Sequence, residues 1–295
     1  MSLPIHLALV CDGVNIPIAE INRVAAALSK QVERDFFPIW KVSATVNAFA
    51  ALEDVPVDYW PVIIMRDVED AAGYHEDKDG QPFAVVEFGS GWSLTASHEV
   101  LEMLADPFGR RMRAGNLPDQ AIALGMAPQR VRYLVEVCDP SEGDQFSYQI
   151  NGIKVSDFYT PNFFDPVFAQ GIRYSFTGDI DAPRKILEDG YISWEDPTTH
   201  DWYQLRMFAD QFSAEVPHVL NLSQETVFEE LRRSSNLRSA IDRVTRRPSP
   251  DHRPLSRALR SAAHVSSDTF QEEQDSNAAW FRTEIQQLKK GSKGQ

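Results

Sequence analysis

The sequence predicts an α+β fold, in which a mixed, twisted sheet carries a helix with a candidate site and a helical, partly flexible tail follows. Three observations predict it. Short apolar segments with strand character recur through the first two hundred residues. Residues 18–36 and 93–105 have helical character. Beyond residue 212 the composition becomes rich in Ser and Arg, so we divide the chain into a domain at 1–212 and a basic tail at 213–295.

The first part of the chain alternates strands with helices. Apolar residues at helical spacing predict a helix over residues 18–36, and Pro38 is expected to end it. The pair Asp79-Gly80 is a hairpin turn signal that leads into an apolar strand. The expected strands are residues 5–12, 40–49, 59–67 and 82–88.

Later elements are less regular. Residues 132–140 have the pattern of a strand, and residues 146–164 that of a hairpin around an Asn-Gly turn. We expect a helix at 202–212. In the tail, residues 226–244 are expected to form one amphipathic helix, and a last short helix is expected at 280–288.

Charge is spread unevenly along the chain. The net charge is −14, of which residues 1–215 contribute −17 and residues 216–295 contribute +3. An acidic main domain argues against nucleic acid as its partner and is compatible with a cation site. Between residues 231 and 260 nine arginines stand against two aspartates. A solvated linker is the favoured interpretation, and a basic segment that binds a partner is the alternative.

The compartment is predicted from two absences. No apolar run approaches the roughly 20 residues that span a membrane, and the apolar start of the chain lacks the basic lead of a signal peptide. The two cysteines, Cys11 and Cys138, are too few for a disulfide framework and are expected to be buried free thiols. We therefore expect a cytoplasmic protein with no membrane partner.

The segment TASHEVLEMLADP, residues 95–107, carries the pattern HEVLE at 98–102. Residues four apart on a helix lie on one face, with Cβ atoms about 5–6 Å apart, so His98 and Glu102 can chelate one ion. In HExxH proteases the Glu beside the first His is the general base, a role that falls to Glu99 here. Glu102 in place of a second His keeps the geometry and makes the metal less Lewis-acidic. Zinc is the expected ion, with another divalent cation as the alternative.

A third ligand is expected from the segment EVCDP at residues 136–140. Side chains three apart on a strand point to opposite faces, so only one of Glu136 and Asp139 is expected to reach the metal. We prefer Asp139, because it lies at the strand end where functional groups collect, and place Glu136 second. Alternatively, His98 and the two glutamates that follow it are ordinary solvated residues of a surface helix.

The order of elements supports the metal hypothesis. An apolar strand, a glycine break and a His-bearing helix follow one another, an order typical of zincin folds. In those folds the strand lies at the edge of the sheet, where an extended peptide can pair with it. We therefore expect a peptide or protein substrate to lie along residues 83–88.

Two motifs resemble those of a known group. ASHEVLEMLADP (96–107) and EVCD (136–139) are similar to the SHExxExxxDP and downstream EIxD motifs of a zincin-like group. That group includes plant phosphate-induced, Exordium-type proteins and bacterial relatives, some of them uncharacterised. The resemblance covers residues 1–205 loosely and is specific in the two motifs. It implies a metallopeptidase-like fold, and the missing second His is a feature of the pattern.

Other candidate residues are less specific. Asp106 fits either support of the metal ligands or a purely structural role. His75 has two aspartates close by, but the spacing lacks the ligand series of an EF-hand, so a hairpin turn is favoured over a calcium loop. Tyr148, Tyr159 and Tyr174 are candidates to donate a hydrogen bond to an oxyanion, and the sequence selects none of them.

Two functions remain as hypotheses. The first is a metal-dependent hydrolase of peptide or other amide bonds, with His98, Glu102 and one of Asp139 and Glu136 as ligands and Glu99 as base. The second is a non-catalytic binding or scaffold protein, in which any metal is structural and the basic tail recruits a partner. Motifs for a serine nucleophile or a nucleotide-binding loop are absent from the sequence.

Overall fold

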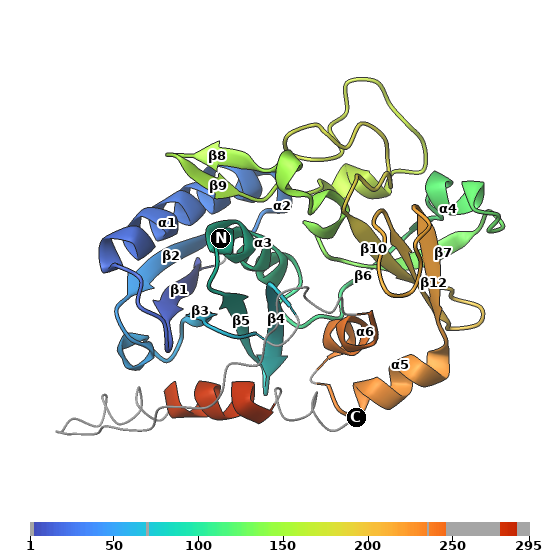
Figure 1. Cartoon of the computed structure of the whole chain (residues 1–295). Coiled ribbons are helices and arrows are strands. Elements are labelled where there is room, and N and C mark those ends of the chain that lie inside the picture. Colours follow the sequence, from blue (N-terminus) through green and yellow to red (C-terminus); the bar gives the residue numbers. More distant parts are fainter. Residues whose placement is uncertain (1–2, 69–70, 235, 246–277, 288–295) are drawn as a thin grey trace.

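The computed structural model describes residues 3–68, 71–234, 236–245 and 278–287 (Figure 1). Within these residues the chain forms a mixed α/β structure with two five-stranded sheets and one two-stranded hairpin. None of the helices in the described part combines the length and the apolar composition that a membrane crossing requires.

The first sheet has the strand order β2-β1-β3-β5-β4. Strand β4 runs antiparallel to β5, and the other neighbours are parallel. A two-residue turn joins β4 to β5, with positive φ at both Asp79 and Gly80, as this hairpin type requires. The strands are β1 (Ile5–Cys11), β2 (Ala44–Phe49), β3 (Trp60–Met65), β4 (Gly73–Lys78) and β5 (Gln81–Glu87).

The four strands expected in this region are therefore present, but the strand expected at 82–88 is not an edge strand. Strand β5 pairs with β3 on one side and with β4 on the other. The expectation that a peptide pairs with residues 83–88 is wrong, because β4 already occupies that edge. An extended peptide at this edge of the sheet would pair with β4.

Side chains alternate between the two faces of the first sheet. Leu7 and Leu9 lie in the main core, whereas Ala8 and Val10 lie in a second cluster on the opposite face. Helices α1 (Ile18–Lys30) and α3 (Trp92–Ala105) cover the first face. The expected C-terminal helix is present at 278–287 and packs into the second cluster.

The first helix does not end at Pro38 as expected. It continues from α1 through a π-helical segment, Gln31–Phe36, into the short helix α2 (Phe37–Trp40). Pro38 is tolerated because it lies in the first turn of α2. The helix ends at Lys41, which has a left-handed φ of 62°.

The second sheet is antiparallel and has the strand order β12-β11-β10-β7-β6. The helix expected at 202–212 is wrong, because residues 202–206 form β11. Tyr203 and Leu205 face the main core and Trp202 faces a third cluster, and burial on both faces hides the strand periodicity. The strands are β6 (Met112–Asn116), β7 (Arg130–Leu134), β10 (Tyr191–Glu195), β11 (Trp202–Arg206) and β12 (His218–Leu222).

Two short helices replace the single helix expected at 226–244. They are α5 (Gln224–Leu231) and α6 (Leu237–Thr245), and they pack on the second sheet through Val227 and Ile241. The domain boundary drawn after residue 212 falls between β11 and β12, which pair in one sheet. The part of the tail expected to be flexible is the Pro- and Ser-rich stretch at 245–277, and it lies outside the described residues apart from Thr245.

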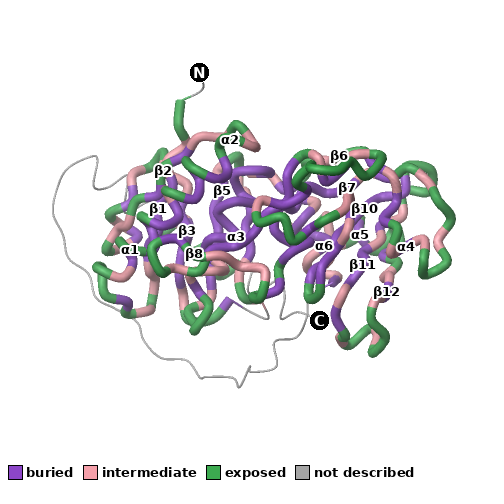
Figure 2. Tube along the Cα trace, turned by 90° about the horizontal axis from the view of Figure 1, so that it is seen from above, coloured by how far each residue is buried: buried purple, intermediate pink, exposed green. Residues whose placement is uncertain are grey.

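Helix α6 lies between the two sheets (Figure 1). The Asn236 side chain caps its start, since Oδ1 accepts a hydrogen bond from Ser239 N at 3.0 Å. Buried residues fill the middle of the molecule, and many of them lie in α3 and α6 (Figure 2). The remaining elements are α4 (Asp119–Ala123) and the expected Asn-Gly hairpin of β8 (Tyr148–Ile150) and β9 (Ile153–Val155).

Candidate metal centre

Helix α3 is fixed in place by buried polar contacts and by close approach to β4. The Ser97 hydroxyl donates to Gln31 Oε1 and accepts from Ser156 N, both at 2.8 Å. A Cβ on Gly73 of β4 would lie 2.6 Å from Thr95 Cγ2, so glycine lets the helix and the strand meet. These contacts hold the HEVLE turn of α3 against the sheet.

The chain after β7 bends toward α3. β7 ends at Leu134, and Asp139–Ser141 forms a turn of 3-10 helix. Cys138 N donates to Glu102 Oε1 at 3.2 Å. Strand alternation stops at Leu134, so the expectation that only one of Glu136 and Asp139 reaches the site is wrong. A carboxylate oxygen from each lies in one group with Glu102, within 4.8 Å of one another.

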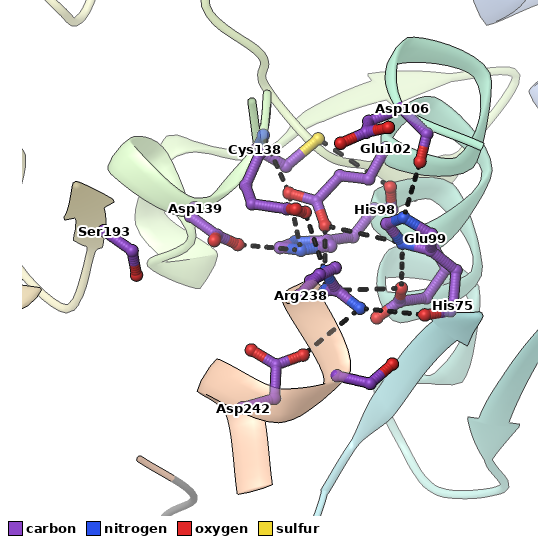
Figure 3. Close-up of polar contacts among 12 residues, drawn as sticks. His75, His98, Glu99, Glu102, Asp106, Cys138, Asp139, Ser193, Arg238 and Asp242 are labelled. Atoms are coloured by element: carbon purple, nitrogen blue, oxygen red, sulfur yellow. Dashed lines mark hydrogen bonds and ion pairs between the residues drawn. The ribbon is translucent and has the colours of Figure 1, made fainter. Parts of the chain in front are cut away.

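His98 lies between Glu102 and Asp139 (Figure 3). Its Nε2 is 3.2 Å from Glu102 Oε1 and 3.2 Å from Asp139 Oδ1. Two ligands bound about 2.0–2.1 Å from one tetrahedral zinc ion are about 3.3 Å apart. Asp139 Oδ1 is buried and has no hydrogen-bond partner. These donor atoms therefore have the spacing that a small cation requires, and one of them lacks any other partner.

The site concentrates buried negative charge. Glu99, Glu102, Glu136 and Asp139 are each at most 5% exposed. Within the described part of the chain, the one arginine or lysine in contact with these carboxylates is Arg238. Burying carboxylates that are not compensated is costly, so the group requires protons or a further cation.

The pKa values of these groups diverge. Burial raises the pKa of Glu102, but the charges of His98 and Arg238 outweigh it and hold that pKa well below its usual range. Burial, together with the charge of Glu102, raises the pKa of Glu136 and of Asp139 well above the usual range. For His98, burial lowers the pKa of the imidazole, but Glu102 and Asp139 raise it well above its ordinary value.

His75 is a member of the site that sequence analysis did not select. The favoured hairpin is present, but His75 lies in strand β4 and not in the turn. Its Nδ1 is 3.4 Å from Glu99 Oε2 and 3.9 Å from Glu102 Oε2. The sequence could have indicated this position. The two-residue turn sets a register that pairs His75 with Ala84, and Ala84 faces the core beneath α3.

Arg238 enters the site from α6 (Figure 3), and no local pattern in the sequence points to it. The residue is 3% exposed and lies more than a hundred residues beyond α3. Its contacts are Nε to Glu136 Oε2 at 2.8 Å, Nη2 to Glu102 Oε2 at 3.1 Å and to Glu99 Oε2 at 3.9 Å, and Nη1 to His75 O at 3.3 Å and to Asp242 Oδ2 at 3.4 Å.

The structure distinguishes among the candidate tyrosines. The Tyr148 hydroxyl donates to Asp35, and the Tyr174 hydroxyl accepts from Ala169 N. The Tyr159 hydroxyl is buried and has no hydrogen-bond partner. Burial, and then the charge of Glu136, raises the pKa of Tyr159 well above its usual range.

Asp106 supports the site through both its side chain and its backbone. Oδ2 accepts from Arg111 N at 2.5 Å, and the carbonyl oxygen lies 3.1 Å from His75 Nε2. Cys138 Sγ also belongs to a potential ligand group with His98 and Glu102, but burial raises the pKa of its thiol well above the ordinary value. Within the described residues both cysteines are free thiols, and Cys138 is the buried one.

Comparison of the chain with protein-family models, with curated proteins and with solved structures finds no match. Its function is therefore inferred from the residues of this site.

Proposed function

We propose that His98, Glu102 and Asp139 bind a divalent cation of the zinc class, with Glu136 as an alternative or additional ligand. We propose further that the protein is a zincin-like, metal-dependent hydrolase of peptide or other amide bonds. The observation that carries the proposal is the pair of 3.2 Å separations about His98 Nε2, beside four buried carboxylates that are contacted by one arginine. The likeness of the two motifs to the SHExxExxxDP group supports it.

The residues around the ligands fit the roles that hydrolysis requires. When bound, the cation would polarise the amide carbonyl and make a water molecule more acidic. Glu99 Oε2, which is buried without a hydrogen-bond partner, would accept a proton from the attacking water and pass it to the leaving amine. The unpartnered Tyr159 hydroxyl would donate to the oxyanion that forms as water adds to the carbonyl carbon.

Helix α6 restricts access to the carboxylates of the site. Glu99, Glu102, Glu136 and Asp139 are buried, whereas 12% of the His98 side chain is exposed. Arg238 also donates to His75 O on the edge strand β4. That carbonyl belongs to the strand with which an extended substrate would pair. The arrangement described here is therefore a closed state of the proposed hydrolase.

A non-catalytic protein is the second candidate function. The observation that favours it is the same burial, since Arg238 compensates part of the carboxylate charge without any substrate. In that case a bound cation would stabilise the fold and be retained without turnover. Metal content combined with a Glu99 variant separates the two functions.

The test begins with elemental analysis of the purified protein beside His98→Ala and Glu102→Ala. We expect about one equivalent of a zinc-class ion in the wild type and its loss in both variants. His200→Ala is the matched control, because His200 is half-exposed and contacts Glu195, away from α3. A wild type that binds no ion even when ions are supplied would show that the ligand assignment is wrong.

Activity is tested next with a quenched-fluorescence peptide library. Glu99→Gln should keep the ion and lose a factor of about 10²–10⁴ in rate, the usual contribution of a general base. If the variant retains the ion and no peptide is cleaved by either protein, the scaffold function is favoured.

A further inference from the structure

The two oxygens of Glu102 face two different sets of groups. Oε1 contacts His98 Nε2 and accepts from Cys138 N, both at 3.2 Å. Oε2 contacts Arg238 Nη2 at 3.1 Å and lies 3.9 Å from His75 Nδ1. The first set belongs to the metal site proposed above. The second set lies on the side of Glu102 toward β4, next to Glu99, the proposed general base, and supplies no ligand to that site.

His75 has the arrangement of a metal-binding histidine. A carbonyl oxygen can only accept, so Nε2 carries the proton that bridges the 3.1 Å to Asp106 O. Metal-bound histidines usually donate their second ring N–H in this way, which fixes the tautomer and leaves the other nitrogen free to bind. Nδ1 is that nitrogen here, and it is buried without a hydrogen-bond partner. The side chain is 0% exposed, so water does not satisfy it.

Glu99 faces the same point. Its Oε2 is also buried without a hydrogen-bond partner and is 3.4 Å from His75 Nδ1. Nδ1 and one oxygen each of Glu99 and Glu102 lie within 4.8 Å of one another. One imidazole and two carboxylates are a common ligand set for first-row divalent cations.

We propose that His75, Glu99 and Glu102 form a second site for a divalent cation, which excludes the side chain of Arg238. The part of the inference in which Glu102 is shared between two ions rests on the proposed function. Carboxylates bridge the ions of two-metal hydrolase sites in this way. The His75 site itself stands on its own three ligands.

Arg238 occupies the position that this cation would need. Its guanidinium approaches the same two oxygens, Oε2 of Glu102 and Oε2 of Glu99. A bare divalent ion and a guanidinium cannot both be bound closely to this oxygen pair, because their charges repel over a few ångströms. Arg238 docking and second-ion binding therefore compete, and without the arginine the pair lacks its positive charge.

The competition extends to the whole of α6. Arg238 N donates to Gly109 O at 2.9 Å, and Asn236 Nδ2 donates to Asp77 Oδ1 on β4 at 3.3 Å. Displacing the guanidinium therefore strains the docked start of the helix. With Arg238 docked, Glu99 binds no ion and can act as a base, with the guanidinium 3.9 Å from its Oε2. With a second ion bound, Glu99 is a ligand and His75 O loses its arginine donor.

The experiment measures bound Mn²⁺ by equilibrium dialysis and by electron paramagnetic resonance on the full-length protein. The set is the wild type, Arg238→Met, His75→Ala and the double variant Arg238→Met/His75→Ala. We expect one ion in the wild type and in His75→Ala, two spin-coupled ions in Arg238→Met, and one again in the double variant. Arg243→Met is the matched control on α6, since Arg243 contacts Glu230 and not the site, and should bind one ion.

Several outcomes would overturn the proposal. Equal ion numbers in Arg238→Met and in the double variant would show that His75 is not a ligand. If the wild type binds two ions while α6 stays protected from hydrogen exchange, the second ion does not displace the Arg238 side chain. If Arg238→Met does not fold, Arg238→Gln replaces it. If neither variant folds, the wild type is titrated with Mn²⁺. The proposal then requires that amide exchange in α6 becomes faster as a second ion binds. Binding of a second ion without faster exchange would show that the ion does not displace Arg238.

The design also separates this inference from the proposed function. In one outcome the wild type binds no ion, Arg238→Met binds one, and the double variant Arg238→Met/His75→Ala binds none. That outcome would contradict the His98 site and support the His75 site. In another outcome the wild type and Arg238→Met each bind one ion, which His98→Ala abolishes and His75→Ala leaves unchanged. That outcome would support the first site and contradict the second.

Discussion

At the scale of single residues, the backbone of Asp139 is positioned by a glycine, Gly190. A Cβ on Gly190 would lie 2.8 Å from Asp139 O and 2.6 Å from Pro140 O. The same turn is held by Leu187 N, which donates to Pro140 O at 2.9 Å. The backbone of the candidate ligand is thus pressed against a position where only hydrogen fits.

Gly190→Ala should therefore displace the Asp139–Pro140 peptide. We expect a loss of about 1–3 kcal/mol in unfolding free energy, typical of overpacking, together with weaker cation binding. Chemical denaturation and metal titration measure the two effects. Gly89→Ala is the control, because a Cβ there meets nothing within 4 Å. Unchanged cation affinity in Gly190→Ala would show that Asp139 is not a ligand or that the turn relaxes freely.

Contacts between site residues could be predicted where neighbours in sequence are also neighbours in space. His98 and Glu102 contact each other because the helix repeat brings residues four apart together. Glu136 and Asp139 were assigned to opposite faces because the strand was drawn too long. Arg238 could not be predicted, since its partners lie 102 and 136 residues earlier and a buried arginine leaves no local pattern.

At the scale of elements, the decisive feature is the docking of α6 by an apolar contact on one sheet and a charged contact at the other. Ile241 is 1% exposed and packs with Leu134, Trp202 and Leu222 of the second sheet. Arg238 reaches the carboxylates at the edge of the first sheet. The apolar contact holds the helix, and the charged contact covers the site.

Ile241→Ala should loosen α6 without touching the carboxylates. Truncating a buried isoleucine costs about 2–5 kcal/mol, and the loss falls on the docking of this helix. Hydrogen exchange should become faster across residues 237–245 while α3 keeps its protection. Val244→Ala, a partly buried position on the same helix, should have a smaller effect. Unaltered exchange in α6 would mean that contacts other than the apolar cluster hold it.

Element prediction was best for the first sheet and the helix that follows it. Strands β1, β3 and β5 are buried apolar runs, and β2 alternates buried and exposed residues, so these patterns identify the strands without tertiary information. Strand β4 was missed because its polar sequence GYHEDK gives no apolar alternation, although the turn beside it was recognised. Strand β11 was taken for a helix because its side chains are buried on both faces.

At the scale of the whole molecule, Arg206 and Asp210 join the second sheet to the end of α6. Arg206 donates both to Asp210 and to Thr245 O, the last residue of α6. Burial raises the pKa of Asp210, but the hydrogen bond from Arg206 outweighs it and lowers that pKa below 3.8. A lowered carboxylate pKa stabilises the fold above the unfolded value and loses that effect as pH falls through the folded value.

Asp210→Asn should therefore destabilise the protein at pH 7 by about 1–3 kcal/mol, the cost of losing a charge-assisted hydrogen bond. The difference from the wild type should shrink as pH falls below 3.8 and the wild-type carboxyl takes up its proton. Urea denaturation at a series of pH values measures it. A difference that persists unchanged in acid would contradict the assignment of the effect to the ionised carboxylate.

The separation between the carboxylates and their arginine has a consequence for synthesis of the chain. Glu102 and Arg238 are 136 positions apart, and the β-strands and α3 that gather the acidic groups come first. Contacts between distant parts of a chain form late, and domains fold as they emerge from the ribosome. Until residue 238 has been made, a guanidinium is not yet there to compensate these carboxylates. Protons and dissolved cations are then the counter-charges at hand, so under the proposed function a nascent chain would bind an ion before helix α6 can dock.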